Sequence, residues 1–153
     1  MRLFPWTKQK EFLSHDEKEV VLHAIREAEQ KTSGEIRVYI ENHCRYVDPI
    51  DRAAELFFGL RMDQTRDRNG VLVYIAVRDR QLAILGDEGI HQRVGKEFWA
   101  KEVHEMLVEF HADHYAAGLA KVITEIGEAL HMHFPYDGKT DKNELPDDIV
   151  FGN

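Results

Sequence analysis

Residues 69–89 read NGVLVYIAVRDRQLAILGDEG, and this stretch decides the fold class. The run from Val71 to Val77 is apolar on both faces, rich in β-branched residues and too short for an ordinary helix. We therefore expect a central strand that is covered on both sides. The charged segment from Arg78 to Gln81 is typical of a turn, and Leu82 to Leu85 continues as a second strand. This pair of strands is predicted to form an antiparallel hairpin.

A helix, a strand and a second helix are predicted before the hairpin. Ser14 and Glu17 have the spacing of a capping box, and the apolar stripe behind them ends near Gly34. Glu35 to Glu41 alternates, as a strand with one buried face does. Asp48-Pro49 then has the composition of a helix start, with an N-cap residue followed by proline.

Helical periodicity returns after the hairpin, between Ile90 and Phe110, with an interruption near Gly95. A last helix follows, for which Asp113 is the expected N-cap and which Pro135 ends. A doubly covered strand with helices before and after it requires helices on both faces of the sheet. The sequence therefore predicts an α/β fold, a three-layer α/β/α sandwich.

The size and charge of the chain narrow the domain organisation and the function. With 153 residues, we expect one domain over residues 14–134, an N-terminal arm over 1–13 and an acidic tail over 135–153. Its 28 acidic residues outnumber 20 Lys and Arg, and the net charge of -8 argues against nucleic-acid binding. The single cysteine, Cys44, excludes an internal disulfide and a four-thiolate zinc site. The absence of a signal-peptide pattern and of a membrane span predicts a cytoplasmic protein.

Two acidic loops flank the hairpin. The second loop has Asp87 and Glu88 between two glycines, and the first has oxygen-bearing side chains on alternate residues: Asp63, Thr65, Asp67 and Asn69. If the hairpin forms, both loops lie at the same edge of the sheet. Calcium and magnesium are held by several oxygens, so these loops are candidates for such a cation. The first loop is no EF-hand, because Arg68 stands where glycine is required; the alternative interpretation is a pair of solvated turns.

Other motifs indicate little chemistry. His111 and His114 lie at a helix junction without the H-E-x-x-H pattern of zinc proteases. Asp113 between them differs, because a carboxylate at a helix start can cap the helix or reach a nearby cation. No phosphate-binding glycine motif or nucleophile elbow occurs, and no nucleophile or general base stands out. The catalytic residues, if there are any, therefore stay unknown at this point.

Several segments, in this order, resemble the TPM-domain family. They are Gly34-Glu35-Ile36, Asn69-Gly70-Val71-Leu72, and the Arg80, Gly86 and Gly89 positions of the hairpin and its loop. The likeness runs over roughly residues 13–131. It implies a Rossmann-like α/β/α sandwich around a small mixed sheet of about four strands. It also implies two crossing loops at one end of the sheet that divalent cations, Ca²⁺ or Mg²⁺, stabilise.

The resemblance also implies a set of metal ligands. Carried over residue by residue, it indicates Asp67, the Asp87-Glu88 pair, and Asp113 before Tyr115. Asp63 is added on the spacing of the first loop alone. All of these are oxygen ligands, which suits calcium or magnesium.

The family suggests two functions for these residues. Relatives are often membrane-tethered or exported, whereas this chain, which shows no tether or Gly-rich tail, resembles a stand-alone TPM domain. We expect a metal-responsive regulatory or binding module, ordered by the cation and open to an unidentified protein partner. The alternative is a metal-dependent acid phosphatase that acts on phosphomonoesters through the same loops, as some plant members are described. A third interpretation is an interaction protein whose loops are solvated turns.

Overall fold

The structure is a computed structural model, and it describes residues 12–136 and 149–152. In chain order the elements are α1 (His15–Glu29), β1 (Glu35–Glu41), α2 (Pro49–Gly59), the 3₁₀ turn η1 (Met62–Gln64), β2 (Gly70–Ala76), β3 (Gln81–Gly86), α3 (Glu88–Val94), α4 (Lys96–His111), α5 (Tyr115–His133) and β4 (Ile149–Phe151). Residues 1–11 of the predicted arm over 1–13, and residues 137–148 and 153 of the predicted tail over 135–153, lie outside the described residues.

The four strands form one mixed sheet in the order β3-β2-β1-β4. The central strand β1 is parallel to β2 and to β4, and β2 is antiparallel to β3. Every residue of β2 is buried, which agrees with an apolar run covered on both faces. The predicted hairpin and the small mixed sheet of about four strands are thus confirmed.

Strand β4 lies where the sequence predicts a loose acidic tail. Val38 pairs with Ile149, and the backbone N–H of Gly152 donates to the carbonyl oxygen of Ile40 at 2.7 Å. Three apolar residues after an acidic stretch are too few to identify a strand from the sequence. Their pairing partner, the free edge of β1, exists only once the sheet has formed.

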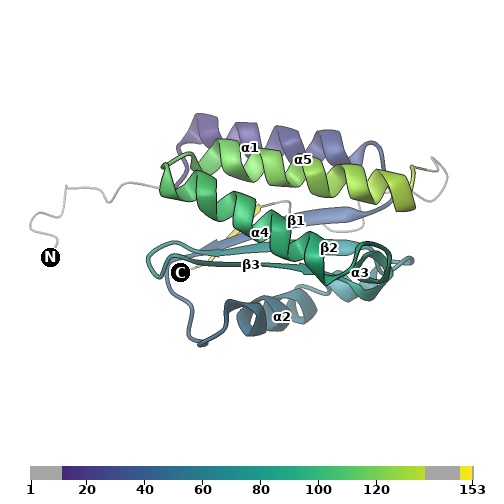
Figure 1. Cartoon of the computed structure of the whole chain (residues 1–153), viewed down its shortest axis with the longest axis horizontal. Helices are drawn as coiled ribbons and strands as arrows, with labels where there is room; N and C mark the ends of the chain where they lie inside the picture. Colours follow the sequence, from purple (N-terminus) through teal and green to yellow (C-terminus); the bar gives the residue numbers. More distant parts are fainter. Residues whose placement is uncertain (1–11, 137–148, 153) are drawn as a thin grey trace, which may run out of the picture.

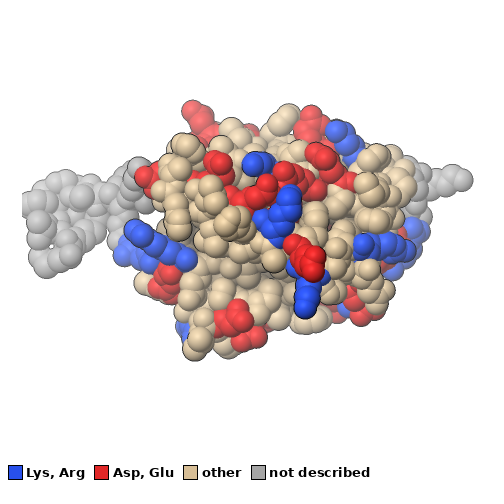
Figure 2. Space-filling view, viewed as in Figure 1, with Lys and Arg blue, Asp and Glu red and all other residues tan. Residues whose placement is uncertain are grey.

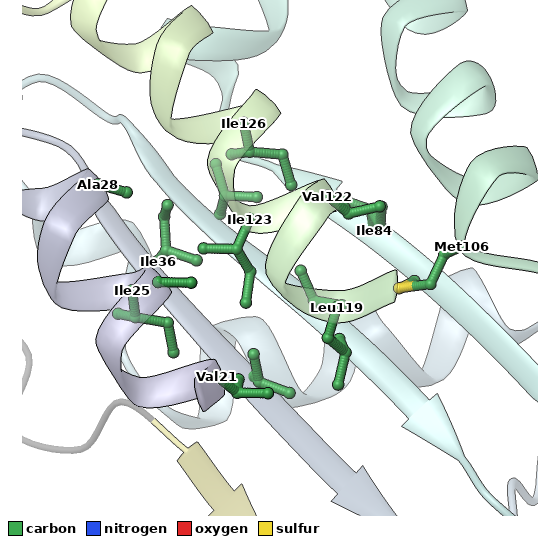
Figure 3. Close-up of a cluster of buried hydrophobic side chains, with 14 of the residues drawn as sticks. Val21, Ile25, Ala28, Ile36, Ile84, Met106, Leu119, Val122, Ile123 and Ile126 are labelled. Carbon is green, nitrogen blue, oxygen red and sulfur yellow. The ribbon is translucent and has the colours of Figure 1, made fainter. Parts of the chain in front are cut away.

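Helices cover both faces of the sheet, as the sequence predicts (Figure 1). On one face α1 and α5 pack side by side, and α4 packs against α5 and β3. Val21 and Ile25 of α1 and Leu119 and Ile123 of α5 point toward one another over Ile36 of β1 (Figure 3). On the other face α2 builds a smaller core, which includes the following residues: Phe57, Leu72 and Tyr74.

The helix ends follow the sequence signals with two exceptions. The first is α1, which ends at Glu29 with Gln30 as its C-cap and not near Gly34. The capping box is present: Glu17 N–H donates to Ser14 Oγ at 3.1 Å, and Ser14 N–H donates to Glu17 Oε1 at 2.8 Å. Gly95, with φ +80°, separates α3 from α4. The predicted N-cap Asp113 is wrong, because His114 holds that position. Asp113 instead has a left-handed φ of 62°, and its carboxylate accepts from the Tyr115 hydroxyl and not from a backbone N–H of α5.

Candidate functional site

The two acidic loops meet at the end of the sheet where β2 begins and β3 ends. The backbone N–H of Asp87 donates to Gly70 O, and that of Gly89 donates to Arg68 O, both at 2.9 Å. Gly89 permits this contact, because an added Cβ would collide with the backbone carbonyl oxygens of Asp67 and Arg68. The loops therefore lie at the same edge, as the hairpin predicts.

Arg68 neutralises the most buried carboxylate of this loop end. Its Nε and Nη2 each donate to one carboxylate oxygen of Asp87 at 2.8 Å, and the Asp87 side chain is 5% exposed. Hydrogen bonding and charge from Asp87, with smaller effects of Glu88 and Asp63, raise the pKa of Arg68. Asp87 also caps α3 by accepting from Glu88 N–H at 2.8 Å. The Arg68 guanidinium therefore satisfies the Asp87 carboxylate, which does not require a cation ligand.

The other predicted loop ligands are also engaged locally. Asp67 pairs with Arg66 at 3.2 Å, and Asp63 accepts from Gln64 Nε2 at 3.3 Å. Within residues 12–136 and 149–152, the loop carboxylates form no group of three whose oxygens lie within 4.8 Å of one another. The structure gathers Asp63, Asp67, Asp87 and Glu88 at one end of the sheet without assembling a coordination shell.

Asp113 lies at the opposite end of the hairpin. It lines a cavity of about 240 Å³ beside the β2–β3 turn and the α4–α5 junction. Arg80 comes from the turn and Gln81 is the first residue of β3, whereas His111 and Tyr115 come from the helices. Because β2 spans the distance between this turn and the acidic loops, Asp113 and Asp87 cannot share one cation.

This cavity, named here the carboxyl-end cavity, lies where α/β sheets commonly bind ligands. The parallel strands β1, β2 and β4 end on this side, and β1 lies between β2 and β4, so that the chain continues from β1 to one side of the sheet and later returns on the other side. Binding crevices of open α/β sheets lie beyond the carboxyl ends of strands at such a switch point. A second cavity of about 220 Å³, which includes Glu41 and Gly152 in its lining, shares Phe12 and Val77 with the first.

The carboxyl-end cavity combines an aromatic wall with a few polar groups. The ring of Phe12 lies 4.7 Å from that of Tyr115 and 5.7 Å from that of Phe110. Asp113 Oδ1 accepts from the Tyr115 hydroxyl at 3.0 Å, and this bond raises the pKa of Tyr115. Gln81 Oε1 is buried and has no hydrogen-bond partner in residues 12–136 and 149–152. An apolar wall with a small number of convergent polar groups is the usual composition of a small-ligand site.

A cluster formed by Glu41, Arg52 and Tyr74 lies at the carboxyl end of β1. Glu41, the last residue of β1, is 7% exposed and accepts from Arg52 Nε at 2.8 Å and Nη2 at 2.9 Å. The Tyr74 hydroxyl also donates to Glu41. Burial acts to raise the pKa of Glu41, but the bonds from Arg52 and Tyr74 hold it below its ordinary value. The sequence did not indicate this cluster, because β1, α2 and β2 each supply one member.

Asp79 of the β2–β3 turn contacts the segment that follows β1, at the same end of the sheet. Asp79 accepts from the backbone N–H of Cys44 at 2.6 Å and contacts His43 Nδ1 at 3.0 Å. The segment after β1 is thereby attached to the β2–β3 turn beside the cavity. The sequence indicated Asp79 and Gln81 only as turn residues. The contacts of Asp79 and the burial of the Gln81 amide depend on segments that are distant in the sequence.

Comparison with solved structures supports this description of the fold. BA42 from the psychrophilic bacterium Bizionia argentinensis is 41% identical, covers 95% of this chain and 99% of its own, and has a TM-score of 0.84. The N-terminal domain of a P. gingivalis protein is 16% identical, with 82% and 83% coverage and a TM-score of 0.61. That of cg2496 from Corynebacterium glutamicum is 12% identical, with 98% and 94% coverage and a TM-score of 0.57. These two similarities concern the fold alone.

No curated protein matches the chain. Among the described helices, none combines the length and apolar character that crossing a membrane requires. The sequence profile described as TPM domain matches residues 6–129, which is most of the chain. This chain therefore belongs to the TPM-domain family.

Proposed function

We propose that this TPM domain binds Ca²⁺ or Mg²⁺ in the carboxyl-end cavity and acts as a cation-responsive binding module. One observation carries the proposal: Asp113 and Gln81 line the same cavity, and the buried Oε1 of Gln81 has no hydrogen-bond partner among the described residues. Carboxylate and amide oxygens are the ligands these hard cations prefer. Asp113 forms no ion pair with any described residue, so its charge is available to a cation.

The acidic loops are a less favourable location for the same ion. A cation that uses Asp87 must displace Arg68 from a two-bond contact and must also leave the cap of α3 intact. Asp113 has only a hydroxyl donor to exchange. The difference in competing charge favours the carboxyl-end cavity over Asp63, Asp67, Asp87 and Glu88.

A calcium and magnesium titration followed by amide NMR tests the proposal. We expect the amides of Gln81 and of residues 111–115 to shift and the melting temperature to rise, because the cation binds only the folded chain. Asp113→Asn should abolish both responses, whereas Asp67→Asn, a matched acid in the first loop, should retain them. Unmoved amides at millimolar calcium and magnesium would overturn the proposal. Shifts confined to residues 63–69 and 87–89 would place the cation in the loops instead.

A second candidate function is phosphomonoester hydrolysis at the same cavity. Arg80 and His111 line it together with Asp113, which places a phosphate-binding guanidinium and an imidazole beside the proposed cation ligand. With magnesium present, turnover of an aryl phosphate should fall at least about 100-fold in Arg80→Ala and in Asp113→Asn. Absence of turnover for several phosphoesters across acidic and neutral pH would exclude this function.

A further inference from the structure

A fully buried acid lies where α4 packs against α5. Trp99, Glu102 and Met106 are the buried residues of α4, at the spacing of one helix face. The Glu102 side chain is 0% exposed, so a carboxyl group occupies the middle of an otherwise apolar stripe. Burying such a group is costly unless a partner satisfies it.

Two further carboxylates converge on Glu102. Glu105 comes from the next turn of α4, and Glu125 comes from α5. One oxygen of each of the three residues lies within 4.8 Å of the other two. Glu102 Oε1 and Glu125 Oε1 are both buried, and neither accepts a hydrogen bond from an N–H or hydroxyl group of the described residues. The cluster, named here the interhelical carboxylate site, therefore contains two buried oxygens that no such donor in the described part of the chain satisfies.

Lysines compensate this site only from its rim. Lys101 Nζ lies 3.2 Å from Glu105, 3.4 Å from Glu102 and 3.7 Å from Glu125, and its side chain is 62% exposed. Lys121 Nζ lies 3.7 Å from Glu105. Figure 2 shows acidic and basic side chains intermingled over α4 on this face. Burial, and then the bond and charge of Glu125, raise the pKa of Glu102 to about 7, so two ammonium groups do not fully stabilise three carboxylates.

We propose that Glu102, Glu105 and Glu125 bind a hard divalent cation that joins α4 to α5. The donor set is all oxygen, which suits calcium, magnesium or manganese. Ligands on opposite sides of a calcium ion lie roughly 4.8 Å apart, because each Ca–O distance is about 2.4 Å. The spacing of the three oxygens is compatible with one such ion, which would replace the Lys101 ammonium that now lies within 3.7 Å of all three carboxylates. Water can complete its shell on the side where Glu105 and Glu125 reach the surface.

This site is separate from the carboxyl-end cavity and does not depend on the proposed function. Glu125 lies ten residues after Tyr115, which is about 15 Å along α5. A cation in the cavity would affect the α4–α5 junction, whereas a cation between Glu102 and Glu125 would affect the middle of both helices. The two proposals can therefore succeed or fail independently.

Paramagnetic manganese localises the site on the full chain. On adding substoichiometric Mn²⁺, we expect the amides of residues 101–106 and 121–126 to broaden, and excess Ca²⁺ to reverse the broadening. Glu125→Gln, whose side chain is partly exposed, should keep the fold and weaken cation binding at least about tenfold. Glu128→Gln, an exposed acid of the same helix, should leave the broadening unchanged.

The Lys101 ammonium competes with a divalent cation for these carboxylates, and its removal distinguishes a cation site from a cluster with a structural role alone. Lys101→Met removes the cation closest to all three carboxylates and should tighten divalent binding, with a lower concentration needed for half-maximal broadening. Broadening confined to residues 80–82 and 111–115 would overturn this inference while supporting the carboxyl-end cavity. Broadening at 101–106 that survives Glu125→Gln would also overturn it. A third result would also overturn the inference: calcium does not change the melting temperature, and Glu102→Gln raises it at pH 8. Glu102 and Glu125 would then share a proton and bind no cation.

Discussion

The two ends of the β2–β3 hairpin hold carboxylates in opposite situations. At the loop end, Asp87 is buried and each of its oxygens accepts from Arg68. At the turn end, Asp113 is exposed beside a cavity and, within the described part of the chain, accepts only from the Tyr115 hydroxyl. The same residue type is a finished structural contact in one place and an available ligand in the other. Whether an acidic residue can serve as a metal ligand therefore depends on whether a basic side chain already pairs with it.

The comparison extends to Glu41, which lies at the same end of the sheet as Asp113. Glu41 is buried and accepts two bonds from Arg52, so it resembles Asp87 more than its neighbour. Burial and an arginine partner occur together, because a desolvated carboxylate without a partner would destabilise the fold. The paired carboxylates should therefore control stability, and the unpaired one should control ligand response.

Removing the partner of Glu41 should have the largest effect. We expect Arg52→Ala to lower the free energy of unfolding by about 3–5 kcal/mol, because Glu41 stays buried without its counter-ion. Urea unfolding followed by circular dichroism measures this loss. Arg78→Ala, at an exposed position of the β2–β3 turn, is the control and should change stability by less than about 0.5 kcal/mol. Equal effects of the two substitutions would contradict a structural role for the Glu41–Arg52 pair.

Acid should weaken the same pair to a smaller extent. The pKa of Glu41 is below its ordinary value of 4.5 in the folded chain, so the folded state binds fewer protons than the unfolded state. Its stabilisation is complete above pH 4.5 and is lost as the pH falls through the lowered pKa. Unfolding measured between pH 6 and 3 should show a shallower acid decline for Glu41→Gln than for the natural chain. Superimposable slopes would mean that Glu41 does not contribute to acid sensitivity.

Replacing the paired carboxylate of the loop end should have an intermediate effect. Asp87→Ala removes both the cap of α3 and the partner of Arg68, so we expect a loss of about 1–2 kcal/mol. Thermal and urea unfolding should agree on this loss. The amides of residues 63–69 should also shift, because Arg68 would no longer hold its loop against Asp87. An unperturbed first loop would show that the Arg68 contact does not order it.

The smallest effect on stability is expected for the unpaired carboxylate. Asp113→Ala should change the free energy of unfolding by less than about 0.5 kcal/mol, since Asp113 is exposed and caps no helix. The same variant should lose the response to calcium and magnesium at the carboxyl-end cavity. A large loss of stability without any added cation would place Asp113 among the structural carboxylates and remove the contrast with Asp87.

Much of the fold could be predicted from local patterns. The two-faced apolar run of β2, the capping box at Ser14 and the interruption at Gly95 each depend on neighbouring residues, and all three appear as expected. Strand β4 could not be recognised, because its three residues form a strand only by pairing with the edge of β1. Asp113 was assigned wrongly as a helix cap, because it has a left-handed backbone and His114, which residue type did not indicate, holds the cap position.

The candidate sites were less accessible to sequence reasoning than the fold. Spacing correctly indicated that the loops holding Asp67 and Asp87 would meet, since the hairpin register follows from the strands. It did not indicate that Arg68 turns back onto Asp87, or that Gln81 is buried without a partner. The interhelical carboxylate site was equally hidden, because Glu102 and Glu125 belong to different helices.

The α/β layers and the hairpin could be predicted from the amino-acid sequence, because apolar periodicity and turn residues act over short stretches of chain, and short motifs indicated the family. The folded chain was needed to see which carboxylates are already paired and which face a cavity or one another. A charge interacts with every group that packing brings within a few ångströms, and these groups come from distant parts of the sequence. Arg68 with Asp87, Arg52 with Glu41, and Glu102 with Glu125 are contacts of this kind.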